Sequence, residues 1–394
     1  MKITTQILAL FLAATCFAAA SDSEFDVTHD PALGLGFRKP IPVCTTGFTG
    51  ETDSIMKFDL LFMGFEQVSR EKARYLIEGK NSPGRVEGVV IDPIEKKTKL
   101  AKAFTGANAR AQVHALADDI AHTLSGEPPI AQTKIAFIAQ TSGVGVGEIV
   151  VSDYDGYNPQ PVTSDGVIVA APTWAGRSDL FYTSYKFGKP DIFSQSLTTG
   201  SRKAVVRFNG LNTSAAVSPD GRHLAMILSK SGNPHVYVSD LAGGNLHQLT
   251  TGKGVYACPC WSPDSRTLCF VSDRGGTAAL YTIPADGGAP ARLPTIGVGR
   301  PTEPDWSPDG KYIVFTSQSR DFSICLVPVN GERRGQATVL VAGQDPAWAP
   351  NSRAVIFTRE VNHRHVLSLL DVPSKQVKDI ARISGSASQP SWAR

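Results

Sequence analysis

The sequence predicts a small α/β domain followed by an all-β, six-bladed propeller of WD40-like repeats. Three observations support this fold class. An anchor segment, usually built on Trp, recurs at positions 174, 217, 261, 306, 348 and 392, so the intervals are 43, 44, 45, 42 and 44 residues. Only strand-like patterns lie between these anchors, which favours propeller blades over a helical solenoid. Before residue 130 the pattern changes to mixed helices and strands.

Each repeat is predicted to supply four antiparallel strands. The anchor strand is followed by a Pro-Asp-Gly turn or a relative of it, in which proline presets φ and Asp-Gly tolerates the remaining turn dihedrals. An apolar second strand comes next, as in Tyr312 to Phe315, and then a third strand such as His235 to Asp240. A glycine-rich turn leads to a short outer strand such as Gln248 to Thr250, which completes the blade.

The two ends of this array each hold part of one repeat. Gln389 to Trp392 forms an anchor strand with nothing after it. The strands predicted at residues 134–138, 148–153 and 160–162 have no anchor before them. Joined, they make a sixth blade, so residues 388–394 should close a propeller that spans residues 130–394 and should place Trp392 beside Phe137. Such closure removes exposed sheet edges.

Residues 37–127 are predicted to form the small α/β domain, and Gly126 to Pro129 marks its boundary with the propeller. The expected elements are a strand at 41–44, a helix at 53–68, a strand at 73–77, a hairpin of strands at 85–91 and 97–104, and a helix at 107–124.

The N-terminus has the pattern of an export signal. A lysine, an apolar run and the small residues Ala18 to Ala20 predict a signal peptide over residues 1–20. A retained membrane anchor, or a lipoprotein built on Cys16, is the less favoured alternative. Residues 21–36 show little periodicity and are predicted to form a mobile N-terminal segment. We therefore expect an exported protein.

Composition excludes several classes of protein. Lys plus Arg (39) exceeds Asp plus Glu (36) by three without a basic cluster, so a nucleic-acid partner is not expected. Beyond the N-terminus there is no run of the roughly 18 apolar residues that a membrane-spanning helix needs, so no direct membrane insertion is expected. A closed ring offers no free strand edge for pairing, so we expect a monomer.

The cysteines are too few for a disulfide framework. Beyond the predicted signal peptide the chain holds Cys44, Cys258, Cys260, Cys269 and Cys325. Cys260 and Cys269 should face each other across a hairpin, and whether they are bonded stays open, although buried free thiols are favoured. Cys-Pro-Cys lacks the spacing of a zinc knuckle, so neither a metal site nor a cofactor is expected.

Several motifs together closely resemble the TolB family. They are the run Val-Ser-Asp-Tyr-Asp-Gly-Tyr-Asn at 151–158, the repeated xPxWSPDG segments, and Phe-Thr-Gly at 104–106 before the second helix. The resemblance covers nearly all of the chain beyond residue 20. It implies a non-enzymatic periplasmic adaptor of the Tol-Pal system, which supports outer-membrane integrity and cell division. The implied partners are a Pal-like peptidoglycan-associated lipoprotein at the propeller mouth and TolA at the N-terminal segment.

The resemblance also suggests which residues contact these partners. The Pal-facing residues are expected in exposed loops just before the anchors, namely Leu211, Asn212, Thr213, Ser214, Tyr256, Ala257, Arg300, Thr302, Glu303, Gln344 and Asp345. The TolA-binding residues are expected to be Ser21, Asp22, Ser23, Glu24, Phe25, Asp26 and Val27. The simpler alternative is that the loops before the anchors only turn the chain.

Two other functions stay open as alternatives. Six-bladed propellers can hold a metal for lyase chemistry, and His363 and His365 would share one strand face, although a solvated pair is favoured. A carbohydrate-binding propeller is the second alternative. A serine peptidase is excluded, because the sequence lacks the Gly-x-Ser-x-Gly elbow and the room for a catalytic domain. No catalytic residue is assigned.

Overall fold

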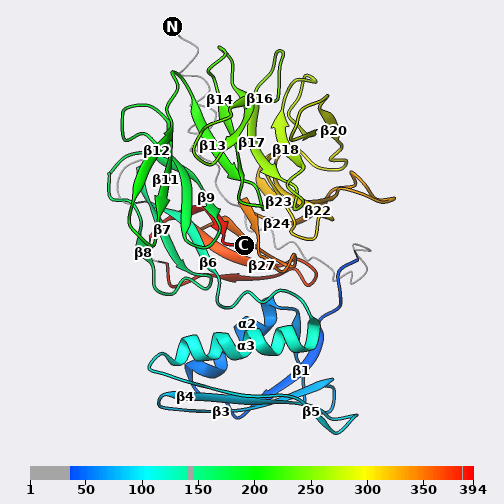
Figure 1. Ribbon diagram of the computed structural model, residues 1–394. Coiled ribbons are helices and arrows are strands. Elements are labelled where there is room, and N and C mark those ends of the chain that lie inside the picture. The colour runs from blue at the N-terminus through cyan, green and yellow to red at the C-terminus, as the bar shows by residue number, and fades with distance from the viewer. Residues whose placement is uncertain (1–35, 141–145, 384) are drawn as a thin grey trace.

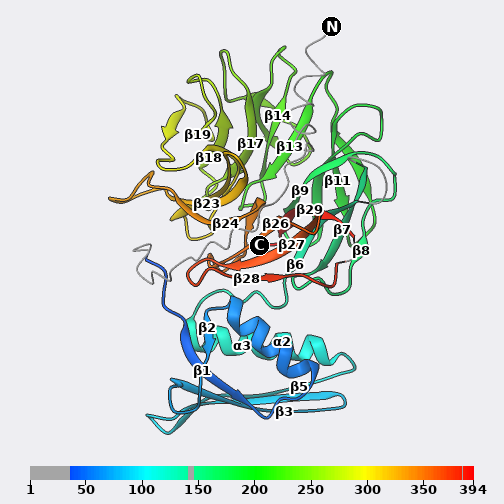
Figure 2. The ribbon, with the colours of Figure 1, turned by 180° about the vertical axis from the view of Figure 1, so that it is seen from behind.

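The computed structural model describes residues 36–140, 146–383 and 385–394. Within them an N-terminal α/β domain packs against a six-bladed β-propeller, as Figures 1 and 2 show from opposite sides. The predicted signal peptide (1–20), most of the predicted segment 21–36 and its TolA-binding residues 21–27 lie outside the described residues. The predicted fold class is confirmed.

The N-terminal domain is a five-stranded sheet in the order β2-β1-β3-β4-β5. Its helices α2 and α3 lie on the face of the sheet that points toward the propeller (Figure 1). Strand β1 pairs in parallel with β2 and β3, and β3, β4 and β5 are antiparallel. The bounds are β1 (Ile41–Thr46), α2 (Glu51–Phe62), β2 (Phe65–Gln67), β3 (Tyr75–Ser82), β4 (Arg85–Asp92), β5 (Lys97–Thr105) and α3 (Ala109–Ser125).

One predicted element of this domain is wrong in its second half. The helix expected over residues 53–68 ends at Phe62, and residues 65–67 form the short parallel strand β2. Gly64 turns the chain with a φ of 89°, which favours glycine. Phe65, only 2% exposed, then pairs with Ile41. Burial against the sheet therefore overrides the helical pattern.

The second helix has caps that fix both its ends. The side chain of Asn108 accepts a hydrogen bond from the Ala111 N–H, which is the N-cap contact this residue type favours. Gly126 ends the helix in the left-handed region, with a φ of 72°. The helix therefore begins two residues after the predicted start and ends next to the predicted domain boundary.

The propeller consists of six four-stranded sheets. We number the blades from β9 onward. Blade 1 is β9 (Val169–Ala175), β10 (Asp179–Ser184), β11 (Asp191–Ser196) and β12 (Arg202–Val206); blade 2 is β13 (Asn212–Val217), β14 (His223–Leu228), β15 (His235–Asp240) and β16 (His247–Gln248); blade 3 is β17 (Tyr256–Trp261), β18 (Thr267–Ser272), β19 (Ala279–Pro284) and β20 (Ala291–Leu293). Blade 4 is β21 (Arg300–Trp306), β22 (Tyr312–Gln318), β23 (Phe322–Pro328) and β24 (Thr338–Ala342); blade 5 is β25 (Gln344–Trp348), β26 (Ala354–Val361), β27 (Arg364–Asp371) and β28 (Gln376–Asp379); blade 6 is β29 (Ala387–Trp392), β6 (Lys134–Gln140), β7 (Gly147–Asp153) and β8 (Gln160–Pro161).

Blade 6 closes the ring with strands from both ends of the propeller sequence, as predicted. Strand β29 pairs antiparallel with β6, and Trp392 lies opposite Ile135. The Trp392 Nε1–H donates a hydrogen bond to the Thr133 hydroxyl at 2.7 Å. The last residues of the chain therefore hold the first and last segments of the propeller together.

The cysteine positions follow the predicted register. Cys260 and Cys269 face each other on β17 and β18, and both are buried. The five cysteines of the described residues are all free thiols. The cross-strand pairing was therefore predicted correctly, and the structure holds the reduced form.

The two domains share one hydrophobic core. Phe62 and Ile120 from the N-terminal domain pack in the same cluster as Tyr154 and Trp392 from blade 6. A polar contact adds to this, because the Asn351 side-chain N–H donates to the Phe62 carbonyl at 2.9 Å. The N-terminal domain therefore packs against the turns of blades 5 and 6.

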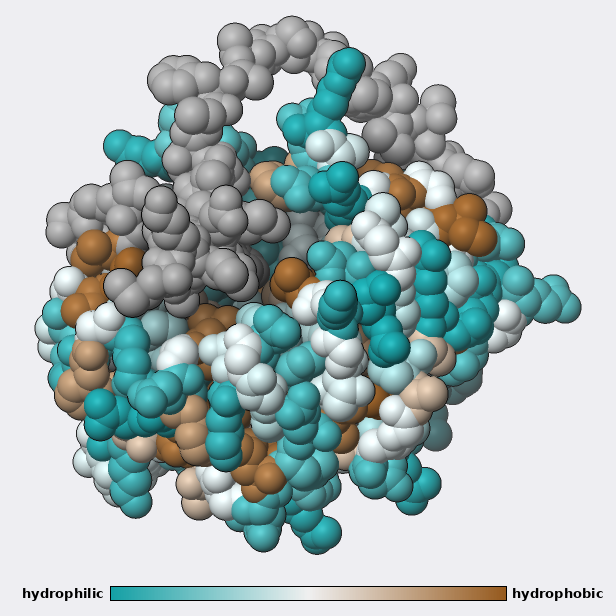
Figure 3. Space-filling model, turned by 90° about the horizontal axis from the view of Figure 1, so that it is seen from above, coloured by the Kyte–Doolittle hydropathy of each residue, from teal (hydrophilic) through white to brown (hydrophobic). Residues whose placement is uncertain are grey.

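The surface seen in Figure 3 is mostly hydrophilic, and its apolar residues gather only in small, separate spots. The large hydrophobic side chains that are most exposed, among them Ile94 and Ile296, are likewise far apart in the sequence. None of the helices in the described ranges is both long and apolar enough to cross a membrane.

Candidate functional site

The first strand of every blade carries a β-bulge at the same place. The first strands of neighbouring blades contact one another all round the ring, so they line the central channel. At each bulge one residue has a φ between 49° and 54°. We name these six residues the neck ring: Ala171, Ser214, Cys258, Glu303, Asp345 and Gln389.

This conformation is unusual for the residues that hold it. Non-glycine residues in the left-handed region cost about 1–3 kcal/mol each, and such residues cluster at functional sites. Five of the six neck-ring residues also precede a proline, which further restricts their backbone. Because the same strained position recurs in all six blades, we infer that the bulge is a regular structural feature of the channel.

Side chains of the neck ring connect successive blades. Glu303 Oε2 accepts a hydrogen bond from the Asp345 N–H at 3.0 Å, and Asp345 Oδ2 accepts one from the Gln389 N–H at 3.1 Å. Gln389 Oε1 then accepts one from the Ala171 N–H at 2.8 Å. Blades 4, 5, 6 and 1 are therefore linked in series by one type of contact, and alanine in blade 1 has no side-chain acceptor to continue it.

Two neighbouring members of this ring are carboxylic acids that lack a cation. Burial, together with the charge of Asp345, raises the pKa of Glu303 to about 8. Burial also raises the pKa of Asp345. Both residues are only partly buried by surface area, so they keep some contact with the channel. Protein groups nevertheless surround most of each carboxyl group. The salt bridges of the described residues do not include either carboxylate, whereas Asp305, further along the same strand β21, pairs with Arg394.

Neutral groups surround this acid pair instead. The Thr316 hydroxyl donates to Glu303 Oε2 at 2.7 Å. On the other side stands the Cys258 thiol, whose pKa burial raises to about 12. The hydroxyl and backbone N–H donors lower the pKa of Glu303, but burial and the neighbouring Asp345 outweigh them, so the carboxyl group keeps its proton more readily than an exposed one does.

The structure places the predicted Pal-facing residues in strands instead of loops. Apart from Leu211, all of them lie in β13, β17, β21 or β25, because the first strands extend up to the mouth of the channel. The prediction of exposed loops is therefore wrong. Arg300 is exposed, Asn212 and Tyr256 are buried, and the other predicted residues are partly buried. Glu303, Asp345 and Ser214 belong to the neck ring.

Asn212 and Tyr256, the two buried residues of the predicted set, stabilise the shape of the channel mouth. Asn212 Oδ1 accepts from the Phe208 N–H at 3.0 Å, and its Nδ2 donates to the Pro190 and Phe208 carbonyls at 3.0 and 2.8 Å. The Tyr256 hydroxyl donates to the Thr251 carbonyl at 2.8 Å. Because their polar atoms are already engaged, these side chains position the mouth and do not offer contacts to a partner.

The predicted histidine pair does not form a metal-ligand face. His363 lies in the hairpin turn between β26 and β27, with a φ of 60°, and His365 lies on β27. Because His363 lies in the turn and not on a strand, the expectation that the two histidines share a strand face is wrong. In the described part of the chain, no group of three or more His, Cys, Asp and Glu side chains could hold a metal ion.

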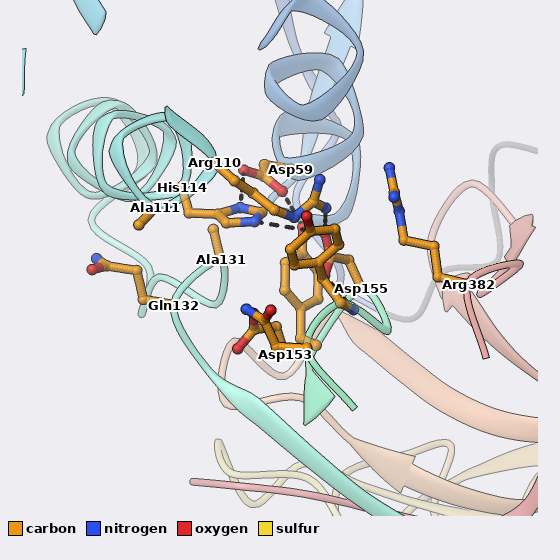
Figure 4. A network of polar contacts seen from close by, with 12 residues as sticks. Asp59, Arg110, Ala111, His114, Ala131, Gln132, Asp153, Asp155 and Arg382 are labelled. Atoms are coloured by element: carbon orange, nitrogen blue, oxygen red, sulfur yellow. Dashed lines mark hydrogen bonds and ion pairs between the residues drawn. The ribbon is translucent and has the colours of Figure 1, made fainter. Parts of the chain in front are cut away.

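A second polar site, missed by sequence reasoning, joins the two domains (Figure 4). We name it the junction cluster: Asp59, Arg110, His114, Tyr154 and Asp155. The Tyr154 hydroxyl donates a short hydrogen bond to one oxygen of Asp59, and His114 Nδ1 lies 2.7 Å from the other oxygen. Tyr154 and Asp155 come from the 151–158 motif that carried the family resemblance, so that motif serves the domain junction.

The junction cluster compensates its buried charges. Arg110 forms ion pairs with Asp155 and, at 2.9 Å, with Glu51. Burial lowers the pKa of Arg110, and burial beside the charge of Asp59 raises the pKa of Tyr154. The Arg110 guanidinium lies over the Tyr157 ring, with its Cζ atom 4.5 Å from the ring centroid. Each buried acid here therefore has a cation or a hydroxyl donor within contact.

Comparisons with known proteins agree with this architecture. The family described as TolB beta propeller domain, PD40, matches residues 122–394. A protein named Tol-Pal system protein TolB from Nitrosomonas europaea is 31% identical over 243 residues, which are 53% of this chain and 55% of that relative. The protein of the same name from Anaeromyxobacter dehalogenans is 28% identical over 270 residues, 57% of this chain and 59% of the relative. The chain thus spans little more than half of these curated relatives.

A solved structure extends the similarity to both domains. The crystal structure of TolB from Acinetobacter baumannii aligns with a TM-score of 0.79 and 23% identity. It covers 91% of this chain, and the alignment includes 97% of that protein. The shared fold therefore includes the N-terminal domain as well as the propeller. With the family match over residues 122–394, these findings show that the chain belongs to the TolB family.

Proposed function

We propose that this protein is a non-enzymatic periplasmic adaptor of the Tol-Pal system that binds a Pal-like lipoprotein at the mouth of its propeller channel. The family membership and the names of the relatives support the assignment to the Tol-Pal system. The observation that carries the site is the neck ring, a repeated and strained set of residues just inside one end of the channel.

The position of the N-terminal domain leaves that end accessible. In a four-stranded antiparallel blade, the turn after the first strand and the turn after the third strand lie at the same end. Asn351 contacts the N-terminal domain from the first kind of turn in blade 5, and Tyr154 does so from the second kind in blade 6. The first strands begin at the opposite end, so a partner there would not collide with the N-terminal domain.

The mouth offers a mixed set of contacts that suits a protein partner. Arg300 at the start of β21 is exposed, and Thr213, Thr302 and Gln344 are partly exposed on three different blades. In protein interfaces a few central residues contribute most of the binding free energy, and arginine is enriched among them. We therefore assign the main contact to Arg300 and supporting contacts to the three polar side chains.

A binding measurement with two charge reversals tests this site. We expect Arg300→Glu to weaken binding of a soluble Pal-like domain, measured by isothermal titration calorimetry, by about tenfold or more. The matched control is Arg222→Glu, because Arg222 is also exposed but lies in the turn after β13, at the other end of the channel. Equal affinities for the wild type and both variants would refute the assignment of the mouth.

The N-terminal segment is proposed to bind TolA through residues 21–27, on the basis of the resemblance alone. Deletion of these seven residues should abolish TolA binding in the same assay and should leave the thermal stability of the folded domains unchanged. Unaltered TolA binding by the deletion variant would contradict this part of the proposal.

A further inference from the structure

Two polar contacts join blade 2 to blade 3 at the end of the propeller away from the mouth. The Trp261 indole N–H donates to the Ala216 carbonyl at 2.9 Å. The Asp220 backbone N–H donates to the Ser265 hydroxyl at 3.1 Å. The same aspartate-to-serine contact joins blade 4 to blade 5, where the Asp309 N–H donates to Ser352 Oγ at 2.9 Å.

Both contacts are replaced at the seam between blades 3 and 4. Gly310 stands where Ser265 and Ser352 stand in the neighbouring blades, so no hydroxyl is available there. The indole N–H of Trp306 donates at 3.3 Å to Gly310 of its own blade. This seam therefore lacks the serine hydroxyl contact that both neighbouring seams have.

A pocket of about 390 Å³ occupies this gap. Its size falls within the range of roughly 300–1,000 Å³ that is typical of small-molecule sites. Trp306, Leu293 and Val329 supply apolar wall, and polar side chains from both blades surround it, including Asp264, Thr267, Thr282, Asn330 and Arg334.

We propose that this pocket binds a neutral, hydroxyl-rich ligand, a carbohydrate, and that one ligand hydroxyl takes the place of the missing serine. The two neighbouring seams show the contact directly, because there a hydroxyl oxygen accepts from the equivalent aspartate N–H. The Asp264 carboxylate disfavours an anion, and Arg334 disfavours a cation. Hydroxyl groups can use the remaining threonine and asparagine side chains, and the apolar wall suits the C–H face of a sugar.

The chain itself provides a substitution that should close the pocket. Gly310 has a φ of 76°, and Ser265 and Ser352 hold φ values of 60° and 52° at the equivalent positions. Serine therefore tolerates this backbone conformation. A Cβ on Gly310 would lie 3.3 Å from Pro263 Cγ at the edge of the pocket, a tight contact that requires Pro263 to shift by a few tenths of an ångström. Gly310→Ser should supply the missing hydroxyl and occupy the position of the ligand.

The test uses the full chain with N,N′-diacetylchitobiose and maltotriose as probes in saturation-transfer NMR titrations. We expect at least one sugar to bind at millimolar concentration, and Gly310→Ser to weaken that binding about tenfold or more. Gly221→Ser, the same substitution in the blade 2 turn, where a Cβ meets open space, should leave it unchanged. Failure of both sugars to bind, or equal binding by wild type and Gly310→Ser, would overturn the proposal.

Hydrogen exchange at the Asp264 amide shows whether the variant has built the new contact. We expect slower exchange of that amide in Gly310→Ser and in the sugar-loaded wild type. If the variant leaves exchange unchanged, Thr282→Val provides the second test, because Thr282 lines the same pocket from blade 3. Undiminished sugar binding by Thr282→Val would then count against the pocket. A change in binding of a Pal-like domain is not expected in either variant, so this test is independent of the function proposed for the mouth.

Discussion

The carboxylates of the junction cluster and those of the neck ring have different surroundings. In the junction cluster, Asp155 has Arg110 as its ion-pair partner, and Asp59 has a tyrosine hydroxyl and a histidine. In the neck ring, Glu303 and Asp345 lie side by side, their hydrogen-bond donors are hydroxyl and backbone N–H groups, and His365 is the nearby titratable base. A paired buried charge is strongly destabilising only when its partner is removed, whereas an unpaired one opposes folding as soon as it is ionised.

This difference suits a structural role for the junction cluster and a binding role for the neck ring. The junction cluster lies in the core that both domains share, so its residues act in domain association. The acids of the neck ring face the channel beneath the proposed partner site, and their backbone is strained. Uncompensated charge and strain together favour the interpretation that the neck ring is maintained for function and not for stability.

The largest effect is expected at the junction, on removal of its cation. Arg110→Ala leaves Asp155 buried with only His114 Nε2, 3.6 Å away, as a possible partner, which should lower the free energy of unfolding by about 3–5 kcal/mol. Urea denaturation followed by fluorescence measures this. Arg382→Ala is the control, because Arg382 is exposed and contacts the exposed Glu51 and the Tyr157 ring, so it should cost less than about 1 kcal/mol. An equal decrease in the free energy of unfolding of both variants would show that the ion pair of Arg110 with Asp155 contributes no more than an exposed ion pair does.

A smaller loss is expected from the hydroxyl that joins the two domains. Tyr154→Phe keeps the packed ring but removes the hydrogen bond to Asp59, which leaves a buried carboxylate oxygen without its donor. The free energy of unfolding should fall by about 1–3 kcal/mol. Thermal unfolding of the variant beside Tyr157→Phe, a hydroxyl removal at the domain edge, provides the comparison. A more stable Tyr154→Phe variant would contradict the role given to this contact.

An effect of opposite sign, which depends on pH, is expected in the neck ring. Because the pKa of Glu303 is raised to about 8 in the folded state, the native protein holds this proton more tightly than the unfolded chain does. Stability from this group is present below the ordinary glutamate pKa and is lost as the pH rises toward 8. Glu303→Gln should therefore leave stability at pH 5 nearly unchanged and should raise it at pH 8 relative to the wild type.

Paired denaturation curves at the two pH values measure this, and Glu332→Gln at an exposed turn is the matched control. A Glu303→Gln variant that loses stability at pH 8 would mean that the carboxylate is ionised and compensated, like those at the junction.

The propeller could be predicted from the sequence because each blade repeats the same turn chemistry. The anchors at Trp261 and Trp306, and the closing pair of β29 with β6, are where the repeats place them. Strand β2 could not be separated from the end of the preceding helix, since three residues carry too little pattern, although Gly64 was a usable signal.

The candidate sites were predictable only in part. The acid pair of the neck ring was named, but its burial and its lack of a cation depend on a bulge that sequence pattern does not reveal. A usable signal exists in the residue that precedes proline in each anchor segment, as in Cys258 and Gln389. The junction cluster had no such signal, because Asp59 and Tyr154 are 95 residues apart and meet only when the two domains pack.

The most direct test of the proposed function is the hydrogen-exchange footprint of a bound Pal-like domain. Binding at the mouth predicts slower amide exchange in the first halves of β21 and β25, around Thr302 and Gln344, and unchanged exchange in the turn at Asn351. Protection confined to the Asn351 turn and the Tyr154 loop, with none in β21 or β25, would place the partner at the domain junction and contradict the account.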